Sequence, residues 1–216
     1  MPENTHVKIC GLRDAASIMA AVQSGADYIG FVFYPPSPRH LSIAEAAALR
    51  AHIPSHVKLV AVTVSPDDAL IKGLVEQVKP DLLQLHGDES AERFSEIRTR
   101  WPALGIIQSI SVSNAADIEK ARTPHALADM LLFDAKPPAG AQLPGGNGVA
   151  FDWRLLAGKT FPRPWLLSGG LTPANVAQAV RESGARMVDV SSGVESTPGV
   201  KDAALIDAFI KAVRTL

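Results

Sequence analysis

Eight short runs of β-branched and leucine residues recur along the 216-residue chain and constrain its fold more than any other feature. Each run is too short for a helix, and most are followed by an alanine-rich amphipathic stretch. This alternation is typical of β-α units on a parallel sheet. The predicted strands cover residues 6–10, 28–33, 58–64, 82–86, 105–109, 130–134, 165–168 and 187–191.

Capping residues mark several helix starts between these runs. Ser42 and Glu45 form a capping box, in which the hydroxyl and the carboxylate each satisfy a free backbone N–H group. Ser65-Pro66 and Thr172-Pro173 each place a capping residue before a proline at the first helical position. The last helix carries one apolar stripe that can pack on a sheet, formed by Ile206, Phe209, Ile210 and Val213.

Eight such units without a linker are what a closed barrel requires, and about 27 residues per unit lies near its lower limit. An open, doubly wound sheet is the alternative, but it has no need of eight units. We therefore predict the α/β class, with one single-domain (β/α)8 TIM barrel over residues 1–216. Residues 137–147 are rich in Pro and Gly, and the sixth helix after them looks very short. A long loop in a compact barrel is usually a binding loop.

The charge balance and the apolar pattern argue against nucleic-acid binders, membrane-surface binders and membrane-spanning proteins. The chain has 21 basic and 22 acidic residues, so we predict no nucleic-acid partner and no membrane-surface partner. The first residues lack the regions of a signal peptide, and no apolar run approaches the length of a membrane span. We expect a cytoplasmic protein, and the sequence leaves monomer and homodimer equally open.

Polar residues gather at the ends of the predicted strands, which form the active face of a barrel. Cys10 ends the first strand and is the only cysteine, so it has no partner for an internal disulfide. Buried packing and chemistry are its two alternatives, and a strand end favours chemistry. The other candidate residues at this end are Arg39, His86, Asp134 and Asp189.

Gly- and Ser-rich loops follow the seventh and eighth strands, where barrels commonly bind a phosphate group. Glycine lets backbone N–H groups approach an anion closely, and serine adds a hydroxyl donor. A third Gly-rich segment after the sixth strand could close another side of the same site. The predicted phosphate ligands are Gly146, Gly148, Gly169, Gly170, Ser191, Ser192 and Gly193.

Strand parity places Lys8 inside the barrel. Side chains two residues apart on a strand share a face, so Lys8 points the same way as Cys10. A buried lysine needs a carboxylate partner or must lose its charge. We predict an ion pair with Asp189 rather than Asp134, because the first and eighth strands are neighbours where the barrel closes. The same parity puts Gln84 and His86 on one side.

We predict no metal site and no cofactor. His52 and His56 have the i, i+4 spacing of a metal pair, but Pro54 between them should break the helix that would bring them together. Trp101 and Trp153, like Trp165, look like packing residues.

The chain resembles the phosphoribosylanthranilate isomerases, a family of tryptophan biosynthesis, over nearly its whole length. Any one matching segment could be chance, but their joint order makes the resemblance specific. These segments are residues 7–11, 30–35 with 37–39, 84–87, 145–148 with 151–153, 167–171, and 188–195 with 198–199 and 201–202.

The resemblance implies an Amadori rearrangement, in which N-(5-phosphoribosyl)anthranilate becomes 1-(2-carboxyphenylamino)-1-deoxyribulose 5-phosphate. Such a reaction needs one acid and one base, and no metal or redox cofactor. By resemblance Asp134 is the acid, Cys10 is the base, and Arg39 meets the anthranilate carboxylate. Asp189 is expected to orient the substrate or other groups, and His86 either contacts the ligand or hydrogen-bonds nearby loops.

These roles make opposite demands on the two groups. Cys10 must be available as a thiolate against an ordinary pKa of about 8.5, while Asp134 must hold a proton against one of about 3.9. A low-dielectric pocket would raise both pKa values. A local group must therefore favour the thiolate, and the substrate iminium is one candidate.

Asn147 departs from the family pattern, since that loop position usually carries a hydroxyl residue, and the loop between Lys136 and Gly145 is rich in proline. Two alternative functions stay open. One is the related aminoaldose isomerase of histidine synthesis, although that family has an aspartate at the position of Cys10. The other is a barrel that binds a phosphorylated ligand as a sensor or scaffold, which would not need an acid opposite a base.

Overall fold

In the computed structural model, eight parallel strands close into a barrel in chain order, with β8 beside β1. The structure describes residues 5–121, 127–137, 140–141, 143, 145–146 and 148–216. The strands are β1 (His6–Cys10), β2 (Tyr28–Phe33), β3 (Lys58–Thr63), β4 (Leu82–Leu85), β5 (Gly105–Val112), β6 (Met130–Ala135), β7 (Trp165–Leu167) and β8 (Met187–Val190). This arrangement confirms the predicted (β/α)8 barrel.

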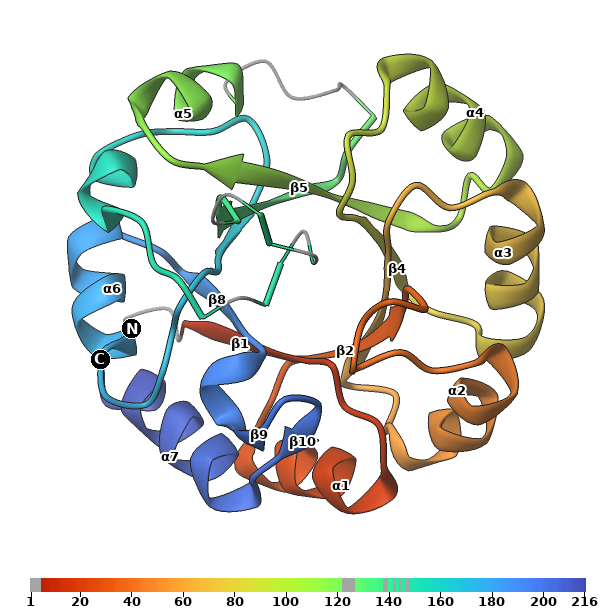
Figure 1. Cartoon of the computed structure of the whole chain (residues 1–216), viewed down its shortest axis with the longest axis horizontal. Helices are drawn as coiled ribbons and strands as arrows, with labels where there is room; N and C mark the ends of the chain where they lie inside the picture. The colour runs from red at the N-terminus through yellow and green to blue at the C-terminus, as the bar shows by residue number, and fades with distance from the viewer. Residues whose placement is uncertain (1–4, 122–126, 138–139, 142, 144, 147) are drawn as a thin grey trace.

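Helices form an outer ring around the strands (Figure 1). They are α1 (Ala15–Ser24), α2 (Ile43–Leu49), α3 (Asp68–Gly73), α4 (Ala91–Arg100), α5 (Ala115–Ala121), α6 (Val176–Ser183) and α7 (Ala203–Arg214). Short 3-10 turns cover η1 (Arg50–His52), η3 (Trp153–Leu156) and η4 (Ser192–Val194), and a π turn covers η2 (Leu74–Val78). The turn η3 stands where the sixth helix would be, so the prediction of a very short element there is confirmed.

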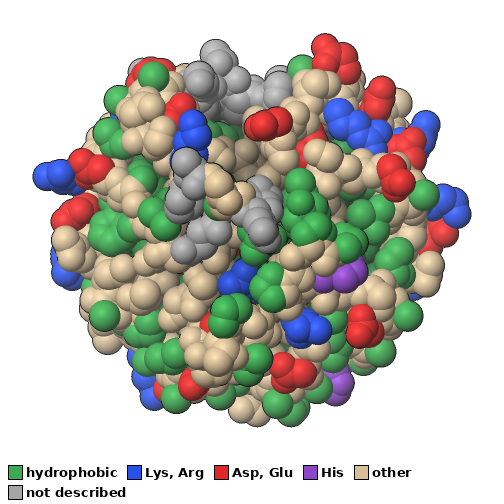
Figure 2. Space-filling model, in the orientation of Figure 1, with side chains coloured by type: hydrophobic (Ala, Val, Ile, Leu, Met, Phe, Trp, Pro, Cys, Tyr) green, Lys and Arg blue, Asp and Glu red, His purple; other side chains and the backbone are tan. Residues whose placement is uncertain are grey.

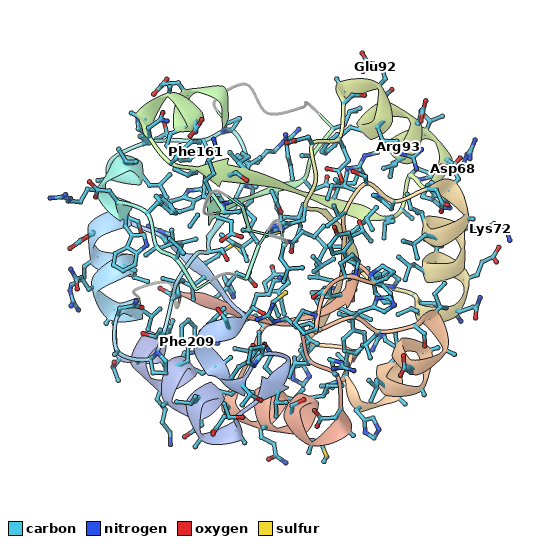
Figure 3. The ribbon with its side chains drawn as sticks, in the orientation of Figure 1. Asp68, Lys72, Glu92, Arg93, Phe161 and Phe209 are labelled. Atoms are coloured by element: carbon cyan, nitrogen blue, oxygen red, sulfur yellow. The ribbon has the colours of Figure 1, made fainter. Side chains whose placement is uncertain are left out.

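Apolar side chains fill two layers, one inside the barrel and one between the strands and the helices. Val60 and Leu132 lie in the inner layer and are fully buried. In the outer layer Phe209 of α7 is directed at the strands (Figure 3), and the whole predicted stripe of α7 is buried. Trp153 belongs to this layer, and Trp101 and Trp165 pack against it. The core thus fixes the strand ends as a rigid platform.

The helix caps agree with the sequence at one of the three predicted starts. Ser42 and Glu45 form the expected capping box of α2. The Ser65-Pro66 prediction is wrong, because the Asp67 carboxylate caps α3 and Ser65 adopts a left-handed φ of 45°. The Thr172-Pro173 prediction is also wrong. There the Asn175 side chain accepts from the Thr172 N–H at 2.8 Å, which forms a turn before α6 begins.

A small antiparallel hairpin follows β8 and η4 and consists of β9 (Glu195–Thr197) and β10 (Val200–Lys201). Its turn contains Gly199 with a φ of 83°, and a Cβ there would lie 2.6 Å from the Pro38 carbonyl oxygen. The hairpin therefore packs against the loop that follows β2. This contact brings Glu195 and Lys201 to the same end of the barrel as Cys10.

The exterior carries both signs of charge. Acidic and basic side chains are interspersed around the rim of the face in Figure 2. On the outer ring, Asp68 of α3 and Arg93 of α4 lie side by side, with Arg93 Nη1 2.8 Å from Asp68 Oδ1 (Figure 3). No helix in the described part of the chain is both long and apolar enough to cross a membrane.

Candidate active site

A pocket lies at the carboxyl ends of the strands, and its lining includes four described residues that follow β6, namely Leu143, Gly145, Gly146 and Gly148. The predicted site residues converge there from six of the strand ends or the loops that follow them. Those that line the pocket are Cys10, Arg39, His86, Asp134, Gly146, Gly148, Gly169, Gly170, Asp189, Ser191 and Ser192. Gly193 lies behind the lining, against the backbone of Leu171.

Lys8 and Asp189 form a buried ion pair where β1 meets β8. The two residues are register partners, and Lys8 Nζ lies 2.7 Å from Asp189 Oδ1. Lys8 is fully buried, so both its interior orientation and its predicted partner are confirmed. Ser168 Oγ donates a second hydrogen bond to Asp189 Oδ2 at 3.1 Å. Both oxygens of this carboxylate are therefore held.

The Cys10 thiol lies next to the Lys8 ammonium, and Gly30 of β2 leaves room for both. A Cβ at Gly30 would lie 3.0 Å from Cys10 Sγ and 3.3 Å from Lys8 Nζ. Burial raises the pKa of the Cys10 thiol above its ordinary value, and Lys8 counteracts part of that rise. Burial alone would lower the pKa of Lys8, but Asp189 and the thiolate outweigh it and raise that pKa. The Asp189 carboxylate thus favours the ammonium form of Lys8 beside the thiol.

Asp134 is held by a hydrogen-bond chain that begins in β4 and β5. Its Oδ2 lies 3.3 Å from His86 Nε2, and its Oδ1 accepts from the Ala135 N–H at 2.9 Å. On the other side of the ring, His86 Nδ1 lies 2.9 Å from both Gln84 Nε2 and Ser109 Oγ. An amide nitrogen only donates, so in this orientation Nδ1 accepts and the ring proton sits on Nε2, facing Asp134. Gln84 and His86 share a side, as parity predicted.

Arg39 enters the pocket from the loop after β2 with a buried side chain, 7% exposed. Its Nε and Nη2 each donate to a carboxylate oxygen of Glu195 at 2.8 Å. Within the described chain no residue accepts a hydrogen bond from Nη1, and a Cβ at Gly146 would lie 2.7 Å from it. Nη1 is thus the nitrogen left for a ligand.

The Gly- and Ser-rich loops pack against one another at the pocket wall. A Cβ at Gly170 would lie 2.7 Å from the Ala150 nitrogen, so the loop after β7 touches the one after β6. A Cβ at Gly148 would lie 3.8 Å from Ser192 Oγ, which links the loops after β6 and β8. Ser191 Oγ donates to the Cys10 carbonyl at 3.1 Å, so this hydroxyl already has a structural partner.

Two further expectations concern Asn147 and a metal site. Asn147, the departure from the family pattern, falls outside the described residues. Among the residues that are described, no three His, Cys, Asp or Glu side chains gather as a metal site.

Comparison with known proteins then decides the family. A family model described as N-(5'-phosphoribosyl)anthranilate (PRA) isomerase matches residues 7–212. The chain belongs to the phosphoribosylanthranilate isomerase family. The isomerase of Paramagnetospirillum magneticum is 54% identical over 208 residues, which are 96% of each chain. That of Caulobacter sp. is 53% identical over 208 residues, 96% of this chain and 97% of the relative.

Solved structures of this family share the fold. The phosphoribosylanthranilate isomerase of Thermotoga maritima superposes with a TM-score of 0.87 at 37% identity, covering 98% of this chain and all of the other. Another isomerase structure has a TM-score of 0.84 at 36% identity with the same coverage. That protein was solved in complex with reduced 1-(o-carboxyphenylamino)-1-deoxyribulose 5-phosphate.

Sequence reasoning missed several residues around the predicted isomerase site. Glu195 and Lys201 lie in segments that resemble the family, yet their spacing alone gave no reason to pair them with Arg39. Ser168 could have been found from its position at the end of the β7 run. The role of Gly30 depends on its register with Cys10, which a single sequence does not reveal.

Proposed function

We propose that this chain catalyses the rearrangement of N-(5-phosphoribosyl)anthranilate to 1-(2-carboxyphenylamino)-1-deoxyribulose 5-phosphate in tryptophan biosynthesis. The observation that carries the proposal is that the Cys10 thiol, beside a buried ammonium, and the Asp134 carboxyl line one pocket. Membership of the isomerase family supports the reaction. The related isomerase that binds a reduced carboxyphenylamino sugar phosphate supports the substrate class.

Asp134 acts first, as the general acid. It gives its proton to the ribose ring oxygen, the C1–O bond breaks, and the nitrogen lone pair forms a C1=N iminium. The new carboxylate keeps two hydrogen-bond donors, the Ala135 N–H at 2.9 Å and His86 Nε2 at 3.3 Å. Such charge-assisted hydrogen bonds stabilise the carboxylate once the proton has left.

Cys10 acts second, as the general base. The iminium acidifies the neighbouring C2 proton, the thiolate removes it, and the C–H electron pair forms an enolamine. Moving a proton from the C2 hydroxyl to C1 then gives the ketone, so the substrate is isomerised without net gain or loss of atoms. Loss of a proton from the Cys10 thiol and gain of one by the Asp134 carboxylate, by exchange with solvent, restore both groups. Lys8 is the local cation that favours the thiolate, and the substrate iminium adds a second positive charge when the base is needed.

The remaining predicted residues anchor the two ends of the substrate. Backbone N–H groups of the loops containing Gly148, Gly170 and Ser192 bind the phosphate, and Arg39 Nη1 binds the anthranilate carboxylate. Asp189 holds Lys8 and so acts through Cys10. The steps are proton transfers and the opening of the C1–O bond, and the proposed acid and base supply them without a metal or a redox cofactor.

Loss of substrate fluorescence tests this function. Purified protein is mixed with freshly generated phosphoribosylanthranilate, and in parallel with the aminoaldose of histidine synthesis. We expect rapid turnover of the first and little or none of the second. Turnover of the second alone would favour the related isomerase, and binding of the first without fluorescence loss would favour a sensor or scaffold.

A further inference from the structure

Glu195 lies between two buried cations at the edge of the pocket. Its carboxylate accepts from Arg39 Nε and Nη2 at 2.8 Å each, and its Oε1 lies 2.6 Å from Lys201 Nζ. The three side chains are almost fully buried, with 7%, 3% and 1% of Arg39, Glu195 and Lys201 exposed. The Gly199 N–H also donates to Glu195 Oε2, at 3.1 Å.

We propose that Glu195 and Lys201 are positioning residues that aim Arg39 Nη1 into the pocket and make the enzyme selective for a substrate carboxylate. The inference rests on the proposed function, because Arg39 must meet the anthranilate carboxylate. It adds a role for the β9–β10 hairpin. The hairpin sets the orientation and the net charge of the group that recognises the aryl end of the substrate.

Orientation follows from how the guanidinium is used. A free arginine offers a planar fork that binds a carboxylate with two nitrogens. Here Glu195 occupies the Nε–Nη2 edge, and Gly11 closes the other side, since a Cβ there would lie 2.6 Å from Arg39 Cδ. The side chain is therefore pinned before a ligand arrives. Nη1 is the guanidinium nitrogen nearest to Gly146 and the one with no contact to Glu195. A group fixed in this way loses little conformational entropy on binding.

The net charge of the cluster explains why a second cation, Lys201, lies beside Glu195. Arg39 and Glu195 alone would form a neutral pair, with little attraction for an anion. Lys201 restores one positive charge to the cluster, and its ammonium is also hydrogen-bonded to the Ser191 carbonyl at 2.9 Å. Arg39, Glu195 and Lys201 together carry a charge of +1 in a buried place where Coulomb interactions are strong. This charge matches the single negative charge of an aryl carboxylate.

Two substrates separate positioning from general structural support. Condensing ribose 5-phosphate with anthranilate gives the carboxylate-bearing substrate, and condensing it with aniline gives an analogue without the carboxylate. In Glu195→Gln we expect kcat/KM for the first to fall about tenfold or more, mainly through KM. The neutral amide no longer holds the guanidinium in its binding orientation, and this loss outweighs the rise in the cluster's charge from +1 to +2. For the analogue, kcat/KM of Glu195→Gln should differ from that of wild type by less than about twofold.

Controls decide among the outcomes. Lys201→Met keeps the Arg39–Glu195 contact but removes the net charge of the cluster, so it should show the same selective loss of kcat/KM. If circular dichroism shows that Glu195→Gln does not fold, Lys201→Met tests the proposal in its place. Glu76→Gln removes an exposed carboxylate paired with Lys72 and should leave kcat/KM unchanged for both substrates. Equal losses on both substrates, or no loss, would overturn the positioning role. Absence of wild-type turnover on the first substrate would instead overturn the proposed function.

Discussion

Replacing Lys8 with methionine should both destabilise the barrel and lower the fraction of Cys10 that is present as thiolate. Methionine keeps the length and the apolar stem of lysine but removes the ammonium 2.7 Å from Asp189. The Asp189 carboxylate, 5% exposed, then keeps only Ser168 as a described side-chain partner. Leaving one partner of a buried ion pair alone costs about 3–5 kcal/mol. For a domain of this size that is a fall in Tm of roughly 6–20 °C.

The double variant Lys8→Met/Asp189→Asn removes both charges, so most of that stability should return. Its thiol should still differ from wild type. Lys8 lowers the pKa of Cys10 by more than Asp189 raises it, so removing both should move the thiol pKa upward. Lys58→Met is the matched control, since it breaks an exposed pair with Asp81 and should cost less than about 1 kcal/mol.

Alkylation with iodoacetamide measures the thiolate directly, because Cys10 is the only cysteine. The rate is followed against pH for wild type, the double variant and the control. The double variant should reach half its maximal rate at a higher pH than the other two. An unchanged or lower midpoint would refute the electrostatic role of Lys8, and an unchanged Tm in Lys8→Met would refute the buried pair.

Three further changes test other parts of the site. Gly30→Ala adds a Cβ 3.0 Å from Cys10 Sγ, so kcat should fall with little change in KM, and an unchanged kcat would contradict the tight fit. Gly193→Ala places a Cβ 1.8 Å from the Leu171 carbonyl oxygen, so Tm should fall and KM should rise; unaltered values would exclude this packing. Burial would raise the pKa of the Glu195 carboxyl, but Arg39 and Lys201 hold that pKa below its ordinary value of 4.5. The ionised carboxylate therefore stabilises the fold above that pH. Urea unfolding should therefore lose stability as pH falls below 4.5, and less steeply in Glu195→Gln if the account is right.

Hydrophobic pattern and strand parity were sufficient to predict the barrel and one of its buried contacts. The Lys8–Asp189 pair followed from parity and closure alone, because a buried ammonium between adjacent strands has few possible partners. Helix starts at Ser65 and Thr172 were wrong for a local reason. Asp67 and Asn175 lie two and three residues further on and accept from the Leu70 and Thr172 N–H groups, and propensity alone does not rank such neighbouring residues.

The Arg39 cluster could not be predicted because it depends on tertiary packing. Glu195 and Lys201 reach Arg39 only through the β9–β10 hairpin, whose turn packs on Pro38. Residues 39 and 195 are 156 positions apart, and charged side chains are too frequent for composition to select a pair. The resemblance therefore predicted that Arg39 meets the carboxylate, but not that its Nε and Nη2 already donate to Glu195.

The central claim is that Cys10 and Asp134 perform the two proton transfers. Its most direct test is the single-turnover rate of Cys10→Ala and Asp134→Asn on freshly generated phosphoribosylanthranilate, with circular dichroism to establish folding. Positioned acids and bases contribute about 10²–10⁴-fold each, so each folded variant should lose at least about a hundredfold in rate. Folded variants that both retain turnover within a few-fold of wild type would contradict the mechanism.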